Sequence, residues 1–123
     1  MAKILIADDQ ATMRHIIADL LKPSGHAITS VEDGVQALEA LKIAPYDLVI
    51  ADVNMPGMDG LEFLRHVRMN YRTKVVFITG MEEETVKLGI EGFHLDGLIL
   101  KPFHPDQALA IIDQALAIRS GER

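Results

Sequence analysis

The sequence predicts an α/β domain of the doubly wound kind, in which a parallel sheet of five strands is covered by five helices. Short apolar runs without charge alternate with amphipathic segments along all 123 residues. Such runs are typical of strands that are buried on both faces. Polar residues follow four of these runs directly, as expected where the carboxyl ends of parallel strands line a site.

Apolar runs place four buried strands, and a more polar segment places the fifth. The buried strands are expected at residues 4–7, 48–51, 75–78 and 98–100, which contain only Ile, Leu, Val, Ala and Phe. Ala27–Val31 mixes Thr29 and Ser30 with apolar residues. We therefore expect it at an edge of the sheet, less buried than the other strands.

Helical periodicity places two helices in the first half of the chain. They are expected at residues 11–22 and 34–43, where Pro23 and Pro45 end the patterns. The apolar side chains expected to face the sheet are Met13, Ile16, Ile17 and Leu20 in the first helix, and Val35, Leu38 and Leu41 in the second.

Three more helices are expected in the second half. The third, at residues 60–69, buries Leu61, Leu64 and Val67, and the fourth, at residues 82–91, is weakened by Gly89 by roughly 1 kcal/mol relative to Ala. The fifth, at residues 105–119, begins at Pro105. It carries two apolar stripes, Leu109-Ile112-Leu116 and Ala108-Ile111-Ala115-Ile118. Packing on one sheet face needs only one stripe, so we expect the second to lie beside Leu98 and the fourth helix.

The composition fits one domain over residues 1–123 and excludes several classes of protein. The net charge of −6 argues against a surface for nucleic acid or anionic membranes. The chain has no cysteine, so it forms no disulfides or thiolate metal sites. The first apolar run is too short for a signal peptide or a membrane span. A cytoplasmic protein is expected.

Five polar side chains from four strand ends are expected to meet at one edge of the sheet: Asp8, Asp9, Asp52, Thr79 and Lys101. Crowded carboxylates repel one another, which raises the pKa of some of them unless a cation neutralises them. A hard divalent ion that keeps several waters suits such oxygens, and Mg²⁺ fits best. A single aspartate at a strand end can simply cap the next helix, but the coincidence of all five favours a metal site.

These residues and their spacing resemble the receiver domain of two-component response regulators. The resemblance covers the entire chain. It rests on Asp8-Asp9, on the run Asp-Val-Asn-Met-Pro-Gly-Met-Asp-Gly that begins at Asp52, on Thr79 at 27 positions after Asp52, and on Lys101-Pro102-Phe103 beginning 22 positions after Thr79. The stretch from Asp8 to Arg14, together with Asn54, looks most like the stand-alone chemotaxis (CheY-like) regulators. The resemblance implies a flavodoxin-like sheet with strand order 2-1-3-4-5.

The resemblance also implies a role for each site residue. Asp52 would accept a phosphoryl group from a sensor histidine kinase or a histidine phosphotransfer protein. Asp9, Asp52 and the backbone carbonyl of Asn54 would hold Mg²⁺, with Asp8 acting through a water. Lys101, whose peptide bond to Pro102 is usually cis in the family, would supply a positive charge, and Thr79 a hydroxyl donor. Such a protein would not be an enzyme beyond catalysing its own phosphorylation and slow dephosphorylation.

The resemblance also implies roles in signalling and signal lifetime, at Thr79 and Asn54 again and at two further positions, Leu98 and Met81. Thr79 would act as a switch residue with Leu98, which stands where the family often has Tyr or Phe. Asn54 and Met81, each two residues after a site residue, would tune hydrolysis of the phosphoryl group. The downstream protein target would bind the surface formed by the fourth helix, the fifth strand and the fifth helix, with the chain a monomer or a weak dimer after phosphorylation.

Other readings stay open. The chain could be a receiver cut from a longer regulator with an output domain, or a pseudo-receiver that only binds partners. A flavodoxin-like electron carrier would need a phosphate-binding loop where Asp8-Asp9 stands. An aspartate-nucleophile phosphatase would need two carboxylates separated by one other residue, and Asp8-Asp9-Gln10 lacks that spacing. Dinucleotide and triphosphate motifs are absent from the sequence.

Overall fold

A computed structural model describes residues 1–80 and 94–117 and contains one parallel sheet with strand order β2-β1-β3-β4-β5. The expected fold class and strand order are therefore confirmed. The strands are β1 (Lys3–Ala7), β2 (Ala27–Val31), β3 (Leu48–Asp52), β4 (Lys74–Thr79) and β5 (Gly97–Leu100). Every residue of β3 is buried, whereas β2 at the sheet edge is mostly exposed, as its polar composition predicts.

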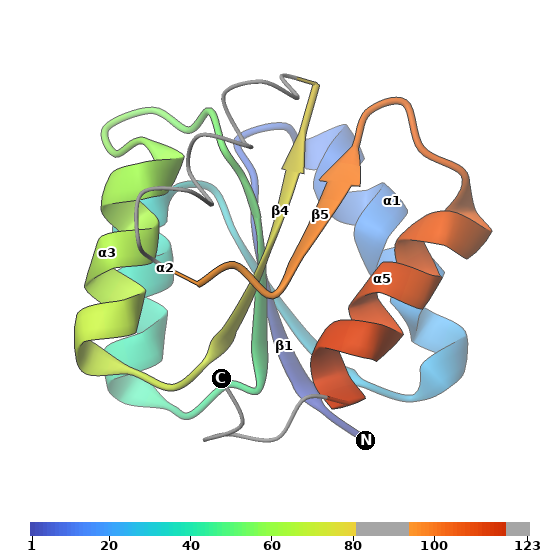
Figure 1. Cartoon of the computed structure of the whole chain (residues 1–123), viewed down its shortest axis with the longest axis horizontal. Helices are drawn as coiled ribbons and strands as arrows, with labels where there is room; N and C mark the ends of the chain where they lie inside the picture. Colours follow the sequence, from blue (N-terminus) through green and yellow to red (C-terminus); the bar gives the residue numbers. More distant parts are fainter. Residues whose placement is uncertain (81–93, 118–123) are drawn as a thin grey trace.

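Helices cover both faces of this sheet (Figure 1). α1 and α5 pack on one face, and α2 and α3 pack on the other. Their bounds are α1 (Ala11–Leu21), α2 (Gly34–Ile43), α3 (Gly60–Asn70) and α5 (Pro105–Ala117), with a 3-10 turn, η1 (Lys22–Ser24), directly after α1. The expected helix at residues 82–91 and the expected end of the last helix lie outside the described residues. None of the described helices is long and apolar enough to cross a membrane.

Alternation of side chains along the strands separates the core into two clusters. Leu5 and Val49 point toward α2 and α3, whereas their neighbours Ile4 and Ile50 point toward α1 and α5. All four side chains are almost completely buried. The strands therefore have apolar residues at successive positions, which explains the uninterrupted runs in the sequence.

Two side chains that were expected to face the sheet are exposed instead. Ile16 in α1 is 45% exposed and Val35 in α2 is 46% exposed. In α2 the small residues Gly34 and Ala37 occupy the buried line together with Leu41. A Cβ atom on Gly34 would lie only 3.4 Å from Met58 Cβ, so the helix approaches its neighbours closely at this point. The inward face of α2 is thus rotated away from Val35.

The second stripe of α5 does not pack against Leu98 as expected, and the expected contact with the fourth helix lies outside the described residues. Leu98 packs with the cluster beneath α2 and α3. α5 packs on the opposite face, where Ile111 joins the cluster of α1. Both predicted stripes of α5 contribute to the packed side of the helix. The buried residues are Ala108, Ile112 and Ala115, and the partly buried ones are Leu109, Ile111 and Leu116. The described part of α5 therefore has no second apolar stripe left over.

A buried ion pair joins α3 to the start of β5. Arg68 Nη2 lies 2.5 Å from Asp96 Oδ2, and the Asp96 side chain is completely buried. The same carboxylate oxygen accepts a hydrogen bond from the Val75 backbone N–H at 2.8 Å. Arg68 also donates to the carbonyl oxygens of Thr73 and His94. The guanidinium thereby fixes the segments that lead into β4 and β5.

Candidate phosphoacceptor site

Four strands deliver the candidate site residues to the same end of the sheet. Asp8 and Asp9 follow β1, Asp52 is the last residue of β3, Thr79 is the last residue of β4, and Lys101 follows β5. The register keeps these positions level, since Asp52 pairs with Ile78 and Thr79 pairs with Leu100. In Figure 1 the arrowheads of β4 and β5 point toward this edge.

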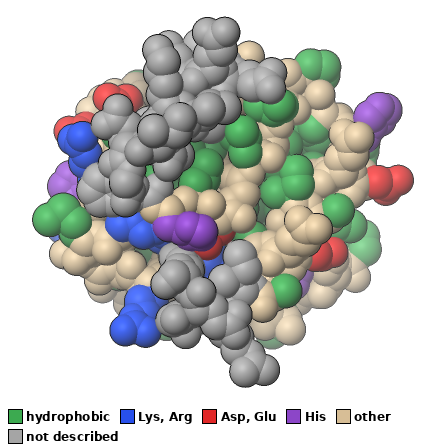
Figure 2. Space-filling model, in the orientation of Figure 1, with side chains coloured by type: hydrophobic (Ala, Val, Ile, Leu, Met, Phe, Trp, Pro, Cys, Tyr) green, Lys and Arg blue, Asp and Glu red, His purple; other side chains and the backbone are tan. Residues whose placement is uncertain are grey.

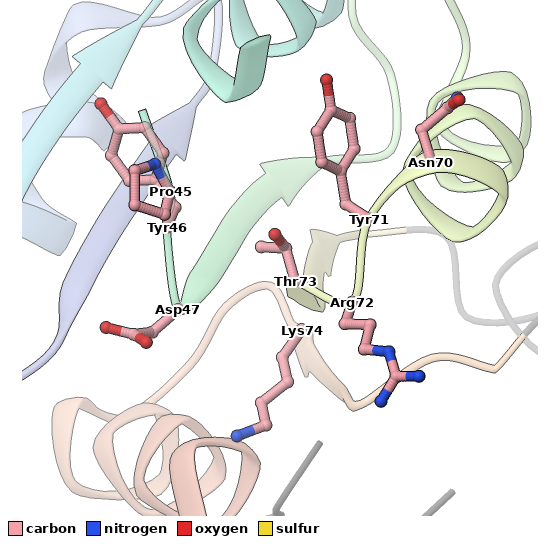
Figure 3. Close-up of a pocket in the computed structure, with 8 residues that line it drawn as sticks. All are labelled: Pro45, Tyr46, Asp47, Asn70, Tyr71, Arg72, Thr73 and Lys74. Carbon is pink, nitrogen blue, oxygen red and sulfur yellow. The ribbon is translucent and has the colours of Figure 1, made fainter. Parts of the chain in front are cut away.

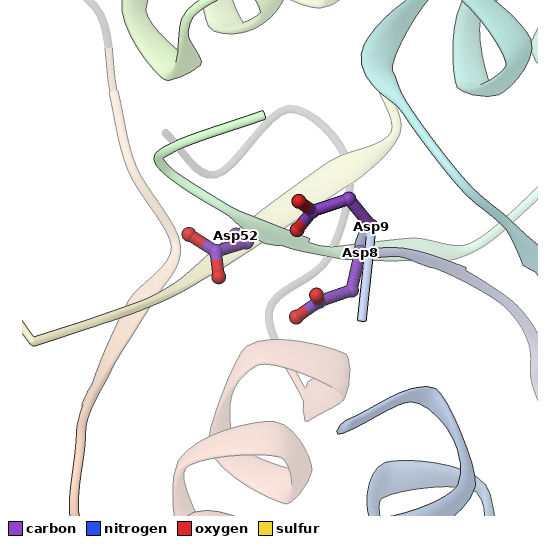
Figure 4. Close-up of side chains that lie close together, drawn as sticks. All are labelled: Asp8, Asp9 and Asp52. Carbon is purple, nitrogen blue, oxygen red and sulfur yellow. The ribbon is translucent and has the colours of Figure 1, made fainter. Parts of the chain in front are cut away.

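The three aspartates converge, as Figure 4 shows. Asp8, Asp9 and Asp52 each offer a carboxylate oxygen, and these oxygens all lie within 4.8 Å of one another. Asp8 and Asp52 are buried, at 2% and 8% exposure, whereas Asp9 is exposed. A cluster of three carboxylate oxygens that is open on one side has the hard donors and the room for water that Mg²⁺ requires.

Both oxygens of Asp52 have partners. Oδ2 lies 2.9 Å from the Lys101 ammonium nitrogen, and Oδ1 accepts a hydrogen bond of 2.8 Å from the Asn54 backbone N–H. The Lys101–Pro102 peptide bond is cis, as the resemblance to receiver domains implies. The Lys101 backbone N–H donates to the Thr79 carbonyl oxygen at 2.8 Å, so the turn after β5 is fixed to the end of β4.

Burial raises the pKa of Asp8 above its usual value, and the neighbouring Asp52 and Asp9 charges raise it further. The Gln10 backbone N–H, which donates to Asp8 Oδ1 at 2.9 Å, and the Lys101 charge oppose this rise. The neighbouring carboxylates thus contribute to the raised pKa of Asp8, as the sequence predicted, but burial is its largest cause. A bound cation would offset the repulsion among the three carboxylates.

Sequence reasoning assigned no role to Arg14, although its side chain binds the backbone of Asp8. Its Nη1 donates a hydrogen bond of 2.7 Å to the Asp8 carbonyl oxygen. Arg14 is one helical turn after Gln10, whose carbonyl oxygen accepts the Arg14 backbone N–H. One signal in the sequence could have identified Arg14: it is a cation in the first turn of the helix that directly follows Asp8 and Asp9. Arg14 fixes the backbone that carries Asp8 and Asp9.

The loop after Asp52 is held close to the sheet at its far end. Gly57 has a φ of +82°, which glycine adopts without strain. Asp59 caps α3 by accepting the Glu62 backbone N–H at 2.8 Å. The Gly60 backbone N–H donates to the Val53 carbonyl oxygen at 2.9 Å, and a Cβ atom on Gly60 would lie 3.0 Å from Val53 Cα. Gly60 therefore permits α3 to begin directly against the residue that follows Asp52.

The remaining predicted positions are less central in the structure. Thr79 is 1% exposed at the end of β4. Leu98 is half-buried in the middle of β5, and the Asn54 side chain is exposed. Met81 lies outside the described residues. The structure therefore brings together Asp8, Asp9, Asp52 and Lys101, with Thr79 on the strand between Asp52 and Lys101.

The sequence matches the model of one protein family, the response regulator receiver domain, over residues 4–113. The chain belongs to this family. The transcriptional regulatory protein ResD of Bacillus subtilis is 35% identical over 87% of this chain, but the match spans only 45% of the length of ResD. The probable chemotaxis protein CheY of Rhizobium etli is 36% identical, and the match covers 90% of this chain and 89% of that protein.

Solved structures of receivers have the same fold. The chemotaxis response regulator CheY4 of Vibrio cholerae superposes with a TM-score of 0.84 at 33% identity, covering 94% of this chain and 98% of that one. The response regulator TrrA of Thermotoga maritima, solved in complex with Mg²⁺-BeF, superposes with a TM-score of 0.83 at 27% identity, covering 94% of this chain and 99% of that one. The chain is a CheY-like receiver domain of two-component signalling.

Proposed function

We propose that the chain is a phosphoacceptor and that Asp52 takes a phosphoryl group from a phosphohistidine of a sensor kinase or phosphotransfer protein. The observation that carries this proposal is the contact of 2.9 Å between Lys101 Nζ and Asp52 Oδ2 beside two further carboxylates. In the transfer, an Asp52 oxygen forms a bond to phosphorus as the phosphorus–nitrogen bond of the donor breaks. The product is an acyl phosphate.

Mg²⁺ is the cofactor that suits this site. Asp9 and Asp52 would hold it together with the backbone carbonyl of Asn54, and Asp8 would act through a water. The support is the donor set, three carboxylates whose oxygens lie within 4.8 Å of one another, and the Mg²⁺-BeF complex of TrrA. When bound, the ion would neutralise charge on the phosphoryl oxygens, which is what phosphoryl transfer chiefly requires.

Lys101 and Thr79 are proposed to recognise the phosphoryl group. Lys101 Nζ can exchange its contact with Asp52 for a phosphoryl oxygen, because a side chain that is 26% exposed has room to move. The Thr79 hydroxyl would donate to another oxygen. Its movement would change the packing around Leu98, so that the affinity for a downstream protein changes. The protein would act on itself only, through its own phosphorylation and slow dephosphorylation.

The surface formed by residues 82–93, β5 and α5 is proposed to bind the downstream protein. Its first part lies outside the described residues. Leu98 cannot act by rotation of an aromatic ring, so a shift of the whole β5 segment would carry the signal. We propose a cytoplasmic regulator that is monomeric or weakly dimeric and binds no nucleic acid through this domain. A receiver within a longer regulator is the alternative that the match to ResD favours.

The lifetime of the phosphoryl group is proposed to depend on Asn54 and Met81. Met81 has no group that could orient an attacking water. We therefore expect Met81→Glu to accelerate loss of the phosphoryl group, measured as the decay of the phosphorylated mass after removal of the donor. An unchanged decay rate would remove Met81 from this role.

Beryllofluoride, a stable mimic of the phosphoryl group, tests the proposed site. Fluorine NMR should show a bound beryllofluoride signal only when Mg²⁺ is present. The signal should disappear in Asp52→Asn and persist in Asp106→Asn, which removes an exposed carboxylate in the first turn of α5. A bound signal in Asp52→Asn, or one that survives removal of Mg²⁺ by EDTA, would overturn the proposal.

A further inference from the structure

The turn between β1 and α1 presents Asp9, whose carboxylate depends on the backbone for its direction. The Asp9 side chain is exposed, yet one of its oxygens lies within 4.8 Å of oxygens of Asp8 and Asp52. Within residues 1–80 and 94–117, this side chain accepts no hydrogen bond and forms no ion pair. The conformation of the turn therefore decides whether the Asp9 carboxylate joins the cluster.

Arg14 holds the peptide unit between Asp8 and Asp9. Its Nη1 atom donates a hydrogen bond of 2.7 Å to the Asp8 carbonyl oxygen. That oxygen lies in the same plane as the Asp9 nitrogen and Cα atoms, because a peptide unit is rigid. Arg14 is itself anchored in the first turn of α1, where its backbone N–H donates to the Gln10 carbonyl oxygen at 3.1 Å. The guanidinium thus fixes the point from which the Asp9 side chain extends.

The contact made by Arg14 uses no carboxylate oxygen. The Gln10 backbone N–H also supports the turn, but it donates to Asp8 Oδ1 at 2.9 Å, an oxygen for which a metal ion or its water would compete. In the described part of the chain, the Gln10 side chain does not cap α1. The hydrogen bond from Arg14 to the Asp8 carbonyl oxygen is therefore a support that a bound ion leaves in place.

We propose that Arg14 is a positioning residue of the metal site, an inference that rests on the proposed binding of Mg²⁺ there. By holding the peptide unit between Asp8 and Asp9, it directs the Asp9 carboxylate toward the ion. Mg²⁺ requires nearly ideal octahedral geometry, whereas Ca²⁺ accepts a flexible arrangement of oxygens. A turn that is held in place thus raises the affinity for Mg²⁺ and favours Mg²⁺ over Ca²⁺.

Positioning and simple charge predict opposite effects of Arg14. A guanidinium close to a site that binds a cation repels that cation, so loss of the charge alone would strengthen Mg²⁺ binding. Loss of a contact that orients a metal ligand weakens binding, commonly by about 10- to 100-fold. The sign of the change in Mg²⁺ affinity therefore identifies which role Arg14 has.

Arg72 provides a matched control at the opposite edge of the sheet. It is exposed and lines a hollow of about 360 Å³ beside the amino end of β4, as Figure 3 shows. In Figure 2 the visible Lys and Arg side chains lie mainly on the α3 side of the molecule, away from α1. Arg72→Met therefore makes the same substitution as Arg14→Met, with the same loss of charge, at the other end of the strands from the aspartates.

An NMR titration measures metal affinity without any phosphoryl donor. Amide resonances of residues 8–10 and 52–54 should shift as MgCl₂ is added, and the midpoint gives the dissociation constant. Arg14→Met should bind Mg²⁺ about tenfold more weakly than the wild type. Arg72→Met should stay within about twofold of the wild type, because a distant charge is screened.

Two further measurements separate positioning from a general loss of structure. The ratio of the Ca²⁺ to the Mg²⁺ dissociation constant should fall at least about threefold in Arg14→Met. Arg14→Lys keeps the charge and a donor for the Asp8 carbonyl oxygen, so it should bind Mg²⁺ within about threefold of the wild type. Circular dichroism checks that each variant folds. If Arg14→Met does not fold, Arg14→Gln replaces it, with the same expectations, because its shorter side chain loses the contact.

Four outcomes would overturn the proposal. They are Mg²⁺ binding by Arg14→Met as tight as that of the wild type or tighter, equal losses in Arg14→Met and Arg72→Met, equal losses in Arg14→Met and Arg14→Lys, and equal weakening of Mg²⁺ and Ca²⁺ binding. Failure of the proposed function gives different results. A wild type that binds no Mg²⁺ would remove the metal site together with this inference. A wild type that binds Mg²⁺ but accepts no phosphoryl group at Asp52 would leave the effect of Arg14 unchanged.

Discussion

Lys101 Nζ contacts Asp52 Oδ2 at 2.9 Å across the end of β4, although the two residues are 49 positions apart in the chain. β4 lies between the strands that carry them, so the contact requires both side chains to reach over Thr79. The ammonium partly balances the three aspartates. In the proposed transfer, a phosphoryl group that reaches Asp52 would therefore meet a positive charge that is already in place.

Replacement of Lys101 should separate the chemical role of the contact from its role in stability. We expect Lys101→Ala to lower the rate of Asp52 phosphorylation by about 10- to 100-fold. The free energy of unfolding should change by less than about 1 kcal/mol, since an ion pair with 26% and 10% exposed side chains is partly screened by water. Lys22→Ala is the control for loss of a charge. An unchanged phosphorylation rate would show that Lys101 does not assist the transfer.

Mg²⁺ should stabilise the folded protein through the carboxylate cluster. A hundredfold excess of ion over its dissociation constant raises the free energy of unfolding by about 2.7 kcal/mol. Asp9→Asn should stabilise the protein without Mg²⁺, because it removes one repelling charge, and should abolish most of the gain with Mg²⁺. Thermal melts with Mg²⁺ and with EDTA measure both effects. Equal responses of wild type and Asp9→Asn to Mg²⁺ would contradict the metal site.

The raised pKa of Asp8 predicts how stability depends on pH in EDTA. The folded state holds the Asp8 proton more tightly than the unfolded chain, whose value is near 3.8. Protonation therefore favours folding, and the stabilisation is complete below about 3.8 and is lost as pH rises through the folded pKa. Asp8→Asn does not titrate there. Urea denaturation should therefore show that the wild type gains stability relative to Asp8→Asn as pH falls from neutral toward 4. A difference in unfolding free energy that stays constant with pH would disprove the raised pKa of Asp8.

Gly60 should be needed for the close approach of α3 to Val53. We expect Gly60→Ala to lower the free energy of unfolding by about 1–3 kcal/mol, because the new methyl group meets backbone atoms of Val53 at 3.0 and 3.1 Å that cannot rotate away. Gly80→Ala is the control, since a Cβ atom there has no heavy atom of residues 1–80 or 94–117 within 4 Å. Urea denaturation compares the two. Equal stability of both variants would show that the loop after Asp52 adjusts freely.

The ends of the strands could be predicted because each unbroken apolar run in the sequence ends at a polar residue. A parallel sheet buried on both faces needs unbroken apolar runs, and the residues Asp8, Asp52, Thr79 and Lys101 mark where each run meets water. The convergence of the site then follows from the sheet topology. The fold and the convergence of these side chains could thus be predicted, but the contact of 2.9 Å between Lys101 Nζ and Asp52 Oδ2 could not, because it depends on how the two side chains are oriented.

Helix faces and buried pairs were less predictable because they depend on close packing. A reading by hydrophobicity places Val35 inward, whereas the structure buries the small residues Gly34 and Ala37. The sequence gives no sign that Asp96 is completely buried, since its partner Arg68 lies 28 positions earlier on a different element. The second stripe of α5 was wrongly placed beside Leu98, because the sequence alone does not show which face of a short strand a given side chain occupies.

Intact-mass spectrometry after incubation with acetyl phosphate tests the central claim, that Asp52 is a Mg²⁺-dependent phosphoacceptor. The wild type should gain the mass of one phosphoryl group in Mg²⁺ and should gain none in EDTA. Asp52→Asn should gain none in either condition, while Asp106→Asn should behave as the wild type does. An adduct of equal yield in Asp52→Asn, or one that forms equally well without Mg²⁺, would contradict the account.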